Sequence, residues 1–258
     1  MKHERVYLDK NDERVYIDTY VADGSPRPAM LVIPGGGYVG VSHFLEGEPI
    51  ALKFLEKGYN TFELNYRVGK SDNYPKQLTD AARAMIYIRE NAESLSVFPD
   101  KVYAVGFSAG GHLTGSLATM FDNAEMKAEF GDKCDKIRPD AVILSYPVIT
   151  AIGACHQGSF ANLLGKPYAD LTEEEKRSFS IECLVNDKTP PVFIWHTAED
   201  KCVPPIGSVK MAAALDKAAC TYKVSIYPYG PHALGLGEED PFVCNWVSEA
   251  CDFIGSLK

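Results

Sequence analysis

The sequence predicts an α/β fold in which helices cover both faces of a mostly parallel central sheet. Short, solidly apolar runs alternate with amphipathic stretches along the 258 residues, and such runs suit strands that are buried on both sides. The composition, with 46% hydrophobic and 24% charged residues, is that of an ordinary globular chain. Because neither a repeat nor a long linker interrupts the alternation, we expect residues 1–258 to form a single domain.

The first element that we expect is an antiparallel hairpin. Residues 5–8 and 14–21 alternate polar and apolar side chains, which is the pattern of half-buried strands. The polar residues 9–12 between them have the composition of a turn. The hairpin therefore precedes the parallel part of the sheet.

Six apolar runs predict the strands of the parallel part. They are residues 29–33, 60–64, 102–107, 141–145, 192–195 and 222–227. Helical patterns follow at residues 47–57, 78–91, 112–121, 205–219 and 240–254. Thr79 or Asp80 is the expected cap of the second of these helices. Right-handed connections would place the carboxyl-terminal loops of the strands along one rim, where such sheets bind ligands.

The interval 148–190 differs from the other connections. It is too long for a simple link between two elements, and it contains its own helical pattern at residues 172–177. An excursion of this length over the rim is typical of a functional loop. We therefore expect residues 148–190 to form a small cap.

The run GFSAG at residues 106–110 is the strongest chemical signal in the chain. It lies between an apolar strand at residues 101–105 and the helical pattern at residues 112–121, so Ser108 is expected on a sharp strand-to-helix turn. Such a turn projects the serine hydroxyl from the rim of the sheet, and the flanking glycines let other backbone approach closely. Ser108 is therefore the predicted nucleophile.

A serine nucleophile needs a general base, and we assign this role to His232. This residue lies in the loop 229–235, after the last apolar strand and before the last helix. Among the other histidines, His112 is expected to pack inside a helix, and His196 to support the loop that follows its strand. His156 lies in the excursion and is a candidate for contacting substrate.

The acid that orients the imidazole is expected directly after the strand 192–195. Two adjacent carboxylates, Glu199 and Asp200, lie there, whereas the preceding strand ends without one. Either of them produces the chain order serine, acid, histidine, which is the order of the α/β-hydrolase arrangement. For Glu199 we favour a solvated loop charge.

Backbone donors for an oxyanion are expected in two places. The run PGGGY at residues 34–38 follows the first central strand, and its three glycines let N–H groups converge on an anion. The amide of Ala109 is the second candidate. The run is not a phosphate loop, because the Walker lysine is missing, and it lacks the spacing of a dinucleotide fingerprint.

Together these motifs resemble the α/β-hydrolase superfamily, and within it the carbohydrate acetyl-esterase-like (acetylxylan esterase-like) branch related to hormone-sensitive-lipase-type esterases. The resemblance spans residues 28–256. The motifs that carry it are the PGGGY run, Asn65-Tyr66-Arg67, Tyr74-Pro75 with Asp80, the GFSAG run up to His112, the Asp200 loop ending in Val203-Pro204, and Gly230-Pro231-His232. It implies an α/β-hydrolase fold with an N-terminal antiparallel hairpin and a small cap insertion.

For the site, the resemblance implies that Ser108 is the nucleophile, Asp200 the acid and His232 the base. Glu199 is then left without a catalytic role. Many relatives carry a histidine where this chain has Pro34, which leaves the donors of the oxyanion hole intact. Those donors would be the backbone amides of Gly36, Gly37 and Ala109.

The implied activity is two-step hydrolysis, through an acyl-enzyme, of short acyl esters, acetyl esters above all, on xylo-oligosaccharides or related sugars. No metal or organic cofactor is required. Candidates for substrate contact are Tyr38, Tyr146 and His156. The alternatives are a kynurenine-formamidase-like or small peptidase-like amide hydrolase, which shares the motifs, and a non-catalytic binding protein on the same scaffold, which usually lacks a triad member.

Charge and cysteine usage bear on partners and location. The net charge of −9 argues against nucleic acid and anionic membranes as partners. The expected partner is a small ester or an acetylated oligosaccharide, and a homo-oligomer is compatible with the sequence. Seven scattered cysteines without a CxxC pair indicate free thiols in the cytoplasm. The amino-terminal segment has no targeting pattern, since charges begin at Lys2 and no apolar stretch follows.

Overall fold

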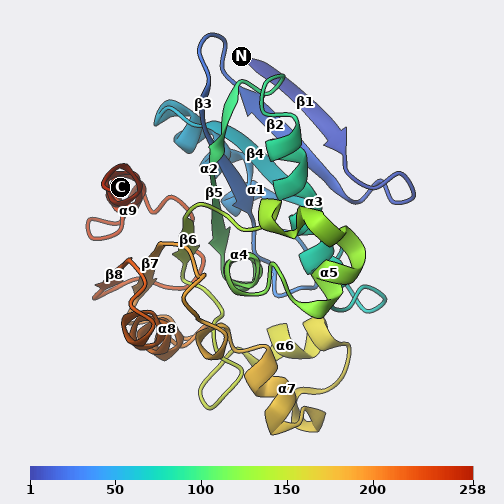
Figure 1. Ribbon diagram of the computed structural model, residues 1–258. Coiled ribbons are helices and arrows are strands. Elements are labelled where there is room, and N and C mark those ends of the chain that lie inside the picture. Colours follow the sequence, from blue (N-terminus) through green and yellow to red (C-terminus); the bar gives the residue numbers. More distant parts are fainter. Residues whose placement is uncertain (258) are drawn as a thin grey trace.

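Eight strands form one sheet across the molecule, in the spatial order β1-β2-β4-β3-β5-β6-β7-β8 (Figure 1). The computed structural model describes residues 1–257. Strands β3 to β8 run parallel to one another, whereas β2 pairs in antiparallel fashion with β1 and β4. The predicted sheet, mostly parallel and preceded by an antiparallel hairpin, is therefore confirmed. The strands are β1 (Lys2–Tyr7), β2 (Tyr16–Val21), β3 (Arg27–Ile33), β4 (Asn60–Asn65), β5 (Val97–Phe107), β6 (Val142–Ser145), β7 (Val192–Thr197) and β8 (Tyr222–Tyr227).

The strands differ from the predicted runs mainly at their ends. Strand β8 covers the predicted residues 222–227. Strand β1 begins at Lys2 rather than at residue 5, because most of its side chains are exposed and leave no apolar signal. Strand β5 begins at Val97 for the same reason, since residues 98–101 are exposed and only the following residues form an apolar run.

Helices cover both faces of the sheet, as predicted (Figure 1). Alternate residues of β3 enter different cores: Leu31 packs in a cluster with residues of α3, α4 and α8, whereas Met30 packs in a cluster with residues of α2 and α9. This period of two is what a strand buried on both faces requires. The α-helices are α1 (His43–Glu46), α2 (Glu48–Glu56), α3 (Lys76–Glu90), α4 (Ala109–Thr119), α5 (Ala124–Phe130), α6 (Gln157–Leu164), α7 (Glu173–Ser178), α8 (Ile206–Lys217) and α9 (Trp246–Gly255).

Three helix starts differ from the prediction, and one of them is that of α4, which begins at Ala109 rather than at residue 112. Helix α3 begins at Lys76, so Thr79 and Asp80 lie inside it and do not cap it. Asp80 is instead buried against Arg67, whose Nε and backbone N–H donate to the carboxylate over 2.9 and 3.0 Å. Helix α9 begins at Trp246 rather than at Asp240. The Asp240 side chain accepts hydrogen bonds from two following backbone N–H groups, which favours a turn over a helix.

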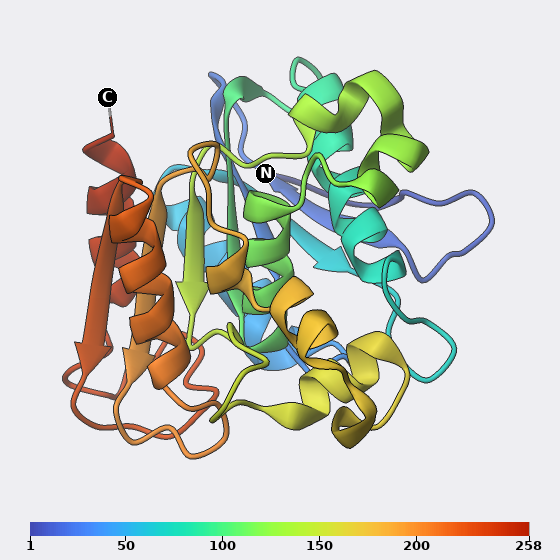
Figure 2. The ribbon, with the colours of Figure 1, turned by 60° about the horizontal axis from the view of Figure 1, so that its bottom comes forward.

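The segment between β6 and β7 contains α6, α7 and two short 3-10 turns. Figure 2 shows it in yellow and gold beside the carboxyl ends of the strands. It has a small apolar core of its own, formed around Phe160 and Leu171. The packing of these apolar side chains holds the elements of the segment together. No helix within residues 1–257 is long and apolar enough to cross a lipid bilayer.

Candidate active site

Ser108 lies at the sharp turn between β5 and α4. Its backbone has a φ of 52° and a ψ of −118°, which is an unfavourable conformation for a residue with a side chain. The two flanking glycines are required by close contacts. A Cβ on Gly106 would lie 2.1 Å from Thr114 Oγ1, and a Cβ on Gly110 would lie 2.2 Å from the carbonyl oxygen of Ile33. The GFSAG run therefore holds the serine hydroxyl at the rim through strain and tight packing.

Three side chains from distant parts of the chain form a continuous hydrogen-bond chain at this rim. Ser108 Oγ lies 2.9 Å from His232 Nε2, and His232 Nδ1 lies 2.6 Å from Asp200 Oδ2. The loops after β5, β7 and β8 bring them together, because parallel strands end at the same edge. A carboxylate only accepts, so Nδ1 carries the proton of the neutral ring and Nε2 is free to accept the serine hydroxyl.

The surroundings of Asp200 keep its carboxylate ionised. The backbone N–H groups of Cys202 and Val203 each donate to Oδ1 over 2.9 Å, and His196 Nε2 lies 3.1 Å from Oδ2. Burial by itself raises the pKa of Asp200, but the hydrogen bonds from His196, His232 and the backbone outweigh it and leave the pKa well below its ordinary value. The neighbouring Glu199 is exposed, and its Oε2 lies 3.4 Å from the Gly230 backbone N–H; no hydrogen bond joins it to the imidazole among residues 1–257.

The glycine-rich loop after β3 packs directly against the serine turn. A Cβ on Gly35 would lie 2.9 Å from the Cβ of Ser108. Among the hydrogen bonds of residues 1–257, none uses the backbone N–H of Gly36, Gly37 or Ala109. These three amides are consequently available to an oxygen atom that carries negative charge.

Comparison with known proteins identifies the family. Residues 16–215 match the family profile named BD-FAE. The chain belongs to the BD-FAE family. This is an esterase family with the α/β-hydrolase fold, and the fold predicted from the sequence is thereby confirmed.

Relatives of this BD-FAE chain include larger proteins. It is 42% identical over 229 residues to an endo-1,4-beta-xylanase B of Butyrivibrio fibrisolvens, in an alignment that covers 87% of this chain and 35% of that protein. It is 28% identical over 231 residues to an acetylxylan esterase of Xylanibacter ruminicola, covering 88% of this chain and 45% of that protein. The chain thus spans less than half the length of these two relatives.

Solved structures match over nearly the whole chain. An acetyl ester-xyloside bifunctional hydrolase from Caldicellulosiruptor lactoaceticus is 32% identical with a TM-score of 0.88, covering 98% of this chain and 96% of that one. The carboxylesterase Cest-2923 from Lactobacillus plantarum is 25% identical with a TM-score of 0.83, covering 99% of this chain and 97% of that one.

Two of the residues predicted to contact substrate, Tyr38 and Tyr146, are buried in the structure. Tyr38 is 1% exposed, and its hydroxyl donates to His112 Nδ1 over 2.9 Å, so the ring belongs to the core. Tyr146 is also 1% exposed, and its ring lies edge-on to His232 with 5.0 Å between the centroids. Both hydroxyls form hydrogen bonds within the protein, and a role in substrate contact stays a prediction for both residues.

His156 lies beside the site and half-buried, at the start of α6. Its Nδ1 accepts from the Ser159 backbone N–H over 3.3 Å. A Cβ on Gly37 would lie 4.0 Å from its Cε1, so the imidazole faces the glycine-rich loop. Burial, and next the nearby His232, lower the pKa of His156. A role in substrate contact stays a prediction for this residue.

Asn162 of α6 is a polar link between the insertion and the glycine-rich loop that the sequence did not indicate. Its Nδ2 donates to the Gly37 carbonyl over 2.8 Å. Asn162 also lines a hollow of about 570 Å³ between α6 and the loop residues Val39 and Lys70. The insertion therefore contacts the backbone that carries two of the candidate oxyanion donors.

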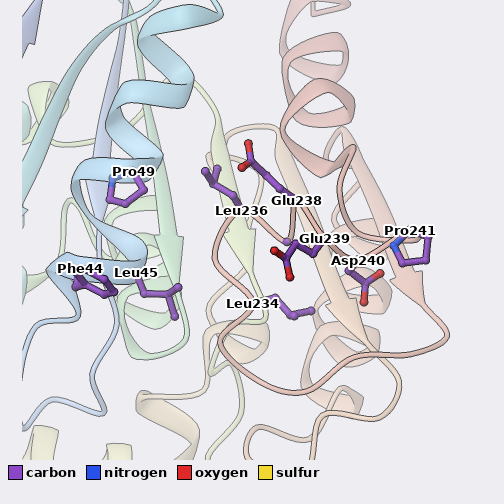
Figure 3. A pocket seen from close by; sticks show the side chains of 10 residues that line it. Phe44, Leu45, Pro49, Leu234, Leu236, Glu238, Glu239, Asp240 and Pro241 are labelled. Atoms are coloured by element: carbon purple, nitrogen blue, oxygen red, sulfur yellow. The ribbon is translucent and has the colours of Figure 1, made fainter.

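A second groove, of about 490 Å³, lies beside the loop of His232. Phe44, Leu45 and Pro49 face residues 234–241 across it (Figure 3). Apolar side chains line both sides of this groove, and residues 238–240 add three carboxylates. Within residues 1–257, no group of three or more His, Cys, Asp or Glu side chains is arranged to hold a metal ion.

Proposed function

We propose that the protein is a serine carboxylic-ester hydrolase that removes short acyl groups, acetyl above all, from xylo-oligosaccharides or related sugars. The observation that carries this proposal is the hydrogen-bond chain from Ser108 through His232 to Asp200. A serine, an imidazole and a buried carboxylate in this arrangement form the catalytic unit of many acyl-transfer enzymes.

In the first step, His232 Nε2 takes the hydroxyl proton while Ser108 Oγ attacks the ester carbonyl carbon. The carbonyl oxygen becomes an oxyanion, and the backbone amides of Gly36, Gly37 and Ala109 donate to it. The imidazolium then protonates the departing sugar oxygen, so that the C–O bond breaks and the acyl group stays on the serine.

In the second step, a water molecule attacks the acyl-enzyme. His232 accepts the water proton and returns it to Ser108 Oγ as the acid leaves. Asp200 holds Nδ1–H throughout and stabilises the charged ring. Each oxyanion donor lowers the barrier by about 3–4 kcal/mol, because it is already oriented when the charge develops.

The substrate class rests on the relatives. An acetylxylan esterase, a xylanase and an acetyl ester-xyloside hydrolase are all similar to this chain. These names share xylan chemistry, and two of them name an acetyl ester. We therefore propose acetylated xylo-oligosaccharides as the first substrates to test. Their ester groups carry no net charge.

Replacing Ser108 with Ala tests the reaction class. We expect hydrolysis of 4-nitrophenyl acetate to fall to the uncatalysed level, while the thermal midpoint of unfolding stays near that of the wild type. The matched control is Ser116→Ala, because Ser116 is buried in α4 and its Oγ donates to the His112 carbonyl, away from the site. Retained turnover in Ser108→Ala would refute the proposal.

A side-by-side substrate panel tests the substrate class. Acetylated xylo-oligosaccharides, longer acyl esters and formylkynurenine are compared by kcat/KM. Highest activity on the acetylated sugars supports the proposal. A preference for formylkynurenine would indicate instead that the protein is an amide hydrolase that uses the same mechanism.

Our proposals for the cellular location of the protein and for its partners rest on the sequence alone. We propose that the protein acts in the cytoplasm, because its seven cysteines are scattered and include no CxxC pair. The net charge of −9 disfavours nucleic acid and anionic membrane surfaces as partners.

A further inference from the structure

Glu46, a buried carboxylate beside the site, has no part in the mechanism described above. It lies at the end of α1 and is 2% exposed. Within residues 1–257, no lysine or arginine lies in ion-pair contact with it. Burial of a carboxylate without a neighbouring cation costs free energy unless hydrogen bonds satisfy its oxygens. Glu46 has two hydrogen-bond donors, the Gly35 backbone N–H and the Tyr146 hydroxyl, and these explain why its burial is tolerated.

One partner belongs to the glycine-rich loop. Glu46 Oε2 accepts from the Gly35 backbone N–H over 2.8 Å. The carbonyl of the same peptide unit, on Pro34, accepts from the Tyr66 hydroxyl over 2.8 Å. The peptide plane is thus held at both ends. The Gly36 and Gly37 N–H groups belong to the next two peptide units, so this plane anchors the start of the segment that carries them.

The other partner belongs to the histidine side of the site. Tyr146 donates its hydroxyl to Glu46 Oε1 over 2.7 Å, and the same hydroxyl oxygen accepts from the Gly235 backbone N–H over 3.1 Å. The Tyr146 ring lies edge-on to His232. Through one tyrosine, Glu46 is connected to the general base and to the loop that carries it.

We propose that Glu46 is a positioning residue that holds the glycine-rich loop and the His232 loop at their reactive separation. This inference rests on the proposed function. Catalysis requires that the oxyanion donors and the base act on the same carbonyl group, and a misplacement of about 1 Å costs roughly 10²-fold in rate. Glu46 is the side chain that contacts the glycine-rich loop directly and the His232 loop through Tyr146.

Glu46→Gln tests this role because it keeps the size of the side chain and removes one acceptor. A carboxylate accepts on both oxygens, whereas the Gln amide accepts on one and donates from the other. If the amide oxygen stays on the Gly35 N–H, the NH2 group faces Tyr146, whose hydroxyl proton then loses its acceptor. If the amide turns the other way, its NH2 group faces the Gly35 N–H. We expect kcat for 4-nitrophenyl acetate to fall about 10- to 100-fold while KM changes less than twofold.

The matched control is Glu63→Gln. Glu63 is 3% exposed, and its carboxylate contacts His43 and packs against Gly47. Among the hydrogen bonds of residues 1–257, none joins it to either catalytic loop. We expect this variant to lower the thermal midpoint of unfolding without changing kcat by more than about twofold. Equal losses of kcat in Glu46→Gln and Glu63→Gln would overturn the inference, since they would indicate a general effect of removing a buried charge.

A second variant and a second readout keep the test independent of folding yield. Tyr146→Phe leaves the Gly35 contact in place and breaks the link to Gly235, so we expect a smaller loss of kcat. Phenylboronic acid forms a tetrahedral adduct with a serine oxygen, and its affinity should fall in Glu46→Gln by the same factor as kcat/KM. Unchanged affinity in both variants would overturn the inference.

The two proposals fail in different ways. A wild-type protein that hydrolyses no ester would overturn the proposed function and this inference with it. An active wild type whose Glu46→Gln variant has the same kcat per folded molecule would overturn only the role of Glu46.

Discussion

Replacing Asp200 with Asn should reverse the tautomer of the catalytic imidazole. Asp200 Oδ1 accepts two backbone N–H groups, from Cys202 and Val203, each over 2.9 Å. An Asn side chain would keep its single oxygen there, because turning it would break both bonds. Its NH2 group would then face His232 Nδ1, where Oδ2 now accepts over 2.6 Å.

The size of the effect follows from that reversal. With the ring proton moved to Nε2, the imidazole can no longer accept the proton of Ser108, whose Oγ lies 2.9 Å away. Turnover at neutral pH should fall about 10⁴-fold, the loss expected when such a histidine is held in the wrong tautomer. This corresponds to about 5 kcal/mol of barrier.

The assay is hydrolysis of 4-nitrophenyl acetate at pH 7, normalised to folded protein by circular dichroism. Glu199→Gln is the matched control, since the neighbouring carboxylate is exposed and should leave kcat within about twofold of the wild type. A loss of less than tenfold in Asp200→Asn would refute the argument. A large loss in Glu199→Gln instead would transfer the role of the acid to that residue.

Three further predictions test the surroundings of the site. Burial lowers the pKa of His112 to about 4, so between pH 6.5 and 4 the unfolded chain binds a proton that the native protein does not. The free energy of unfolding should therefore fall on acidification by up to about 3 kcal/mol, and His112→Gln should remove this slope in urea titrations. Gly110→Ala should lower stability by about 1–3 kcal/mol and abolish most activity, because its Cβ would lie 2.2 Å from backbone; Gly255→Ala, with open space around it, should do neither. Asn162→Ala should lower kcat/KM up to about tenfold by releasing the Gly37 carbonyl, and wild-type kinetics would contradict that link.

Several elements could be predicted from the sequence because their signals are local. The serine turn needs a strand, two glycines and a helix in succession, and all of them lie within residues 101–121. The parallel strands follow from apolar runs, since a strand covered on both faces has few polar positions. Where side chains are exposed, as in β1, the boundary was missed because no burial pattern marks it.

Other features required contacts between distant residues. Asp80 is of a residue type that often caps helices, but it lies inside α3 and binds the guanidinium of Arg67. Tyr38 follows the glycine run in sequence, yet its ring turns into the core and binds His112. In each case the deciding partner is far away in the chain, and apolar periodicity carries no information about it.

The sequence by itself determined the class of fold, the family resemblance and the order of serine, acid and histidine along the chain. The tertiary structure places Asp200 against His232, as the resemblance implies, and only the tertiary structure decided that Glu46 connects the two loops around Ser108. The physical reason is that periodicity reports which face of an element is buried. It does not report which buried side chains meet, because that depends on how the helices and loops pack on the sheet.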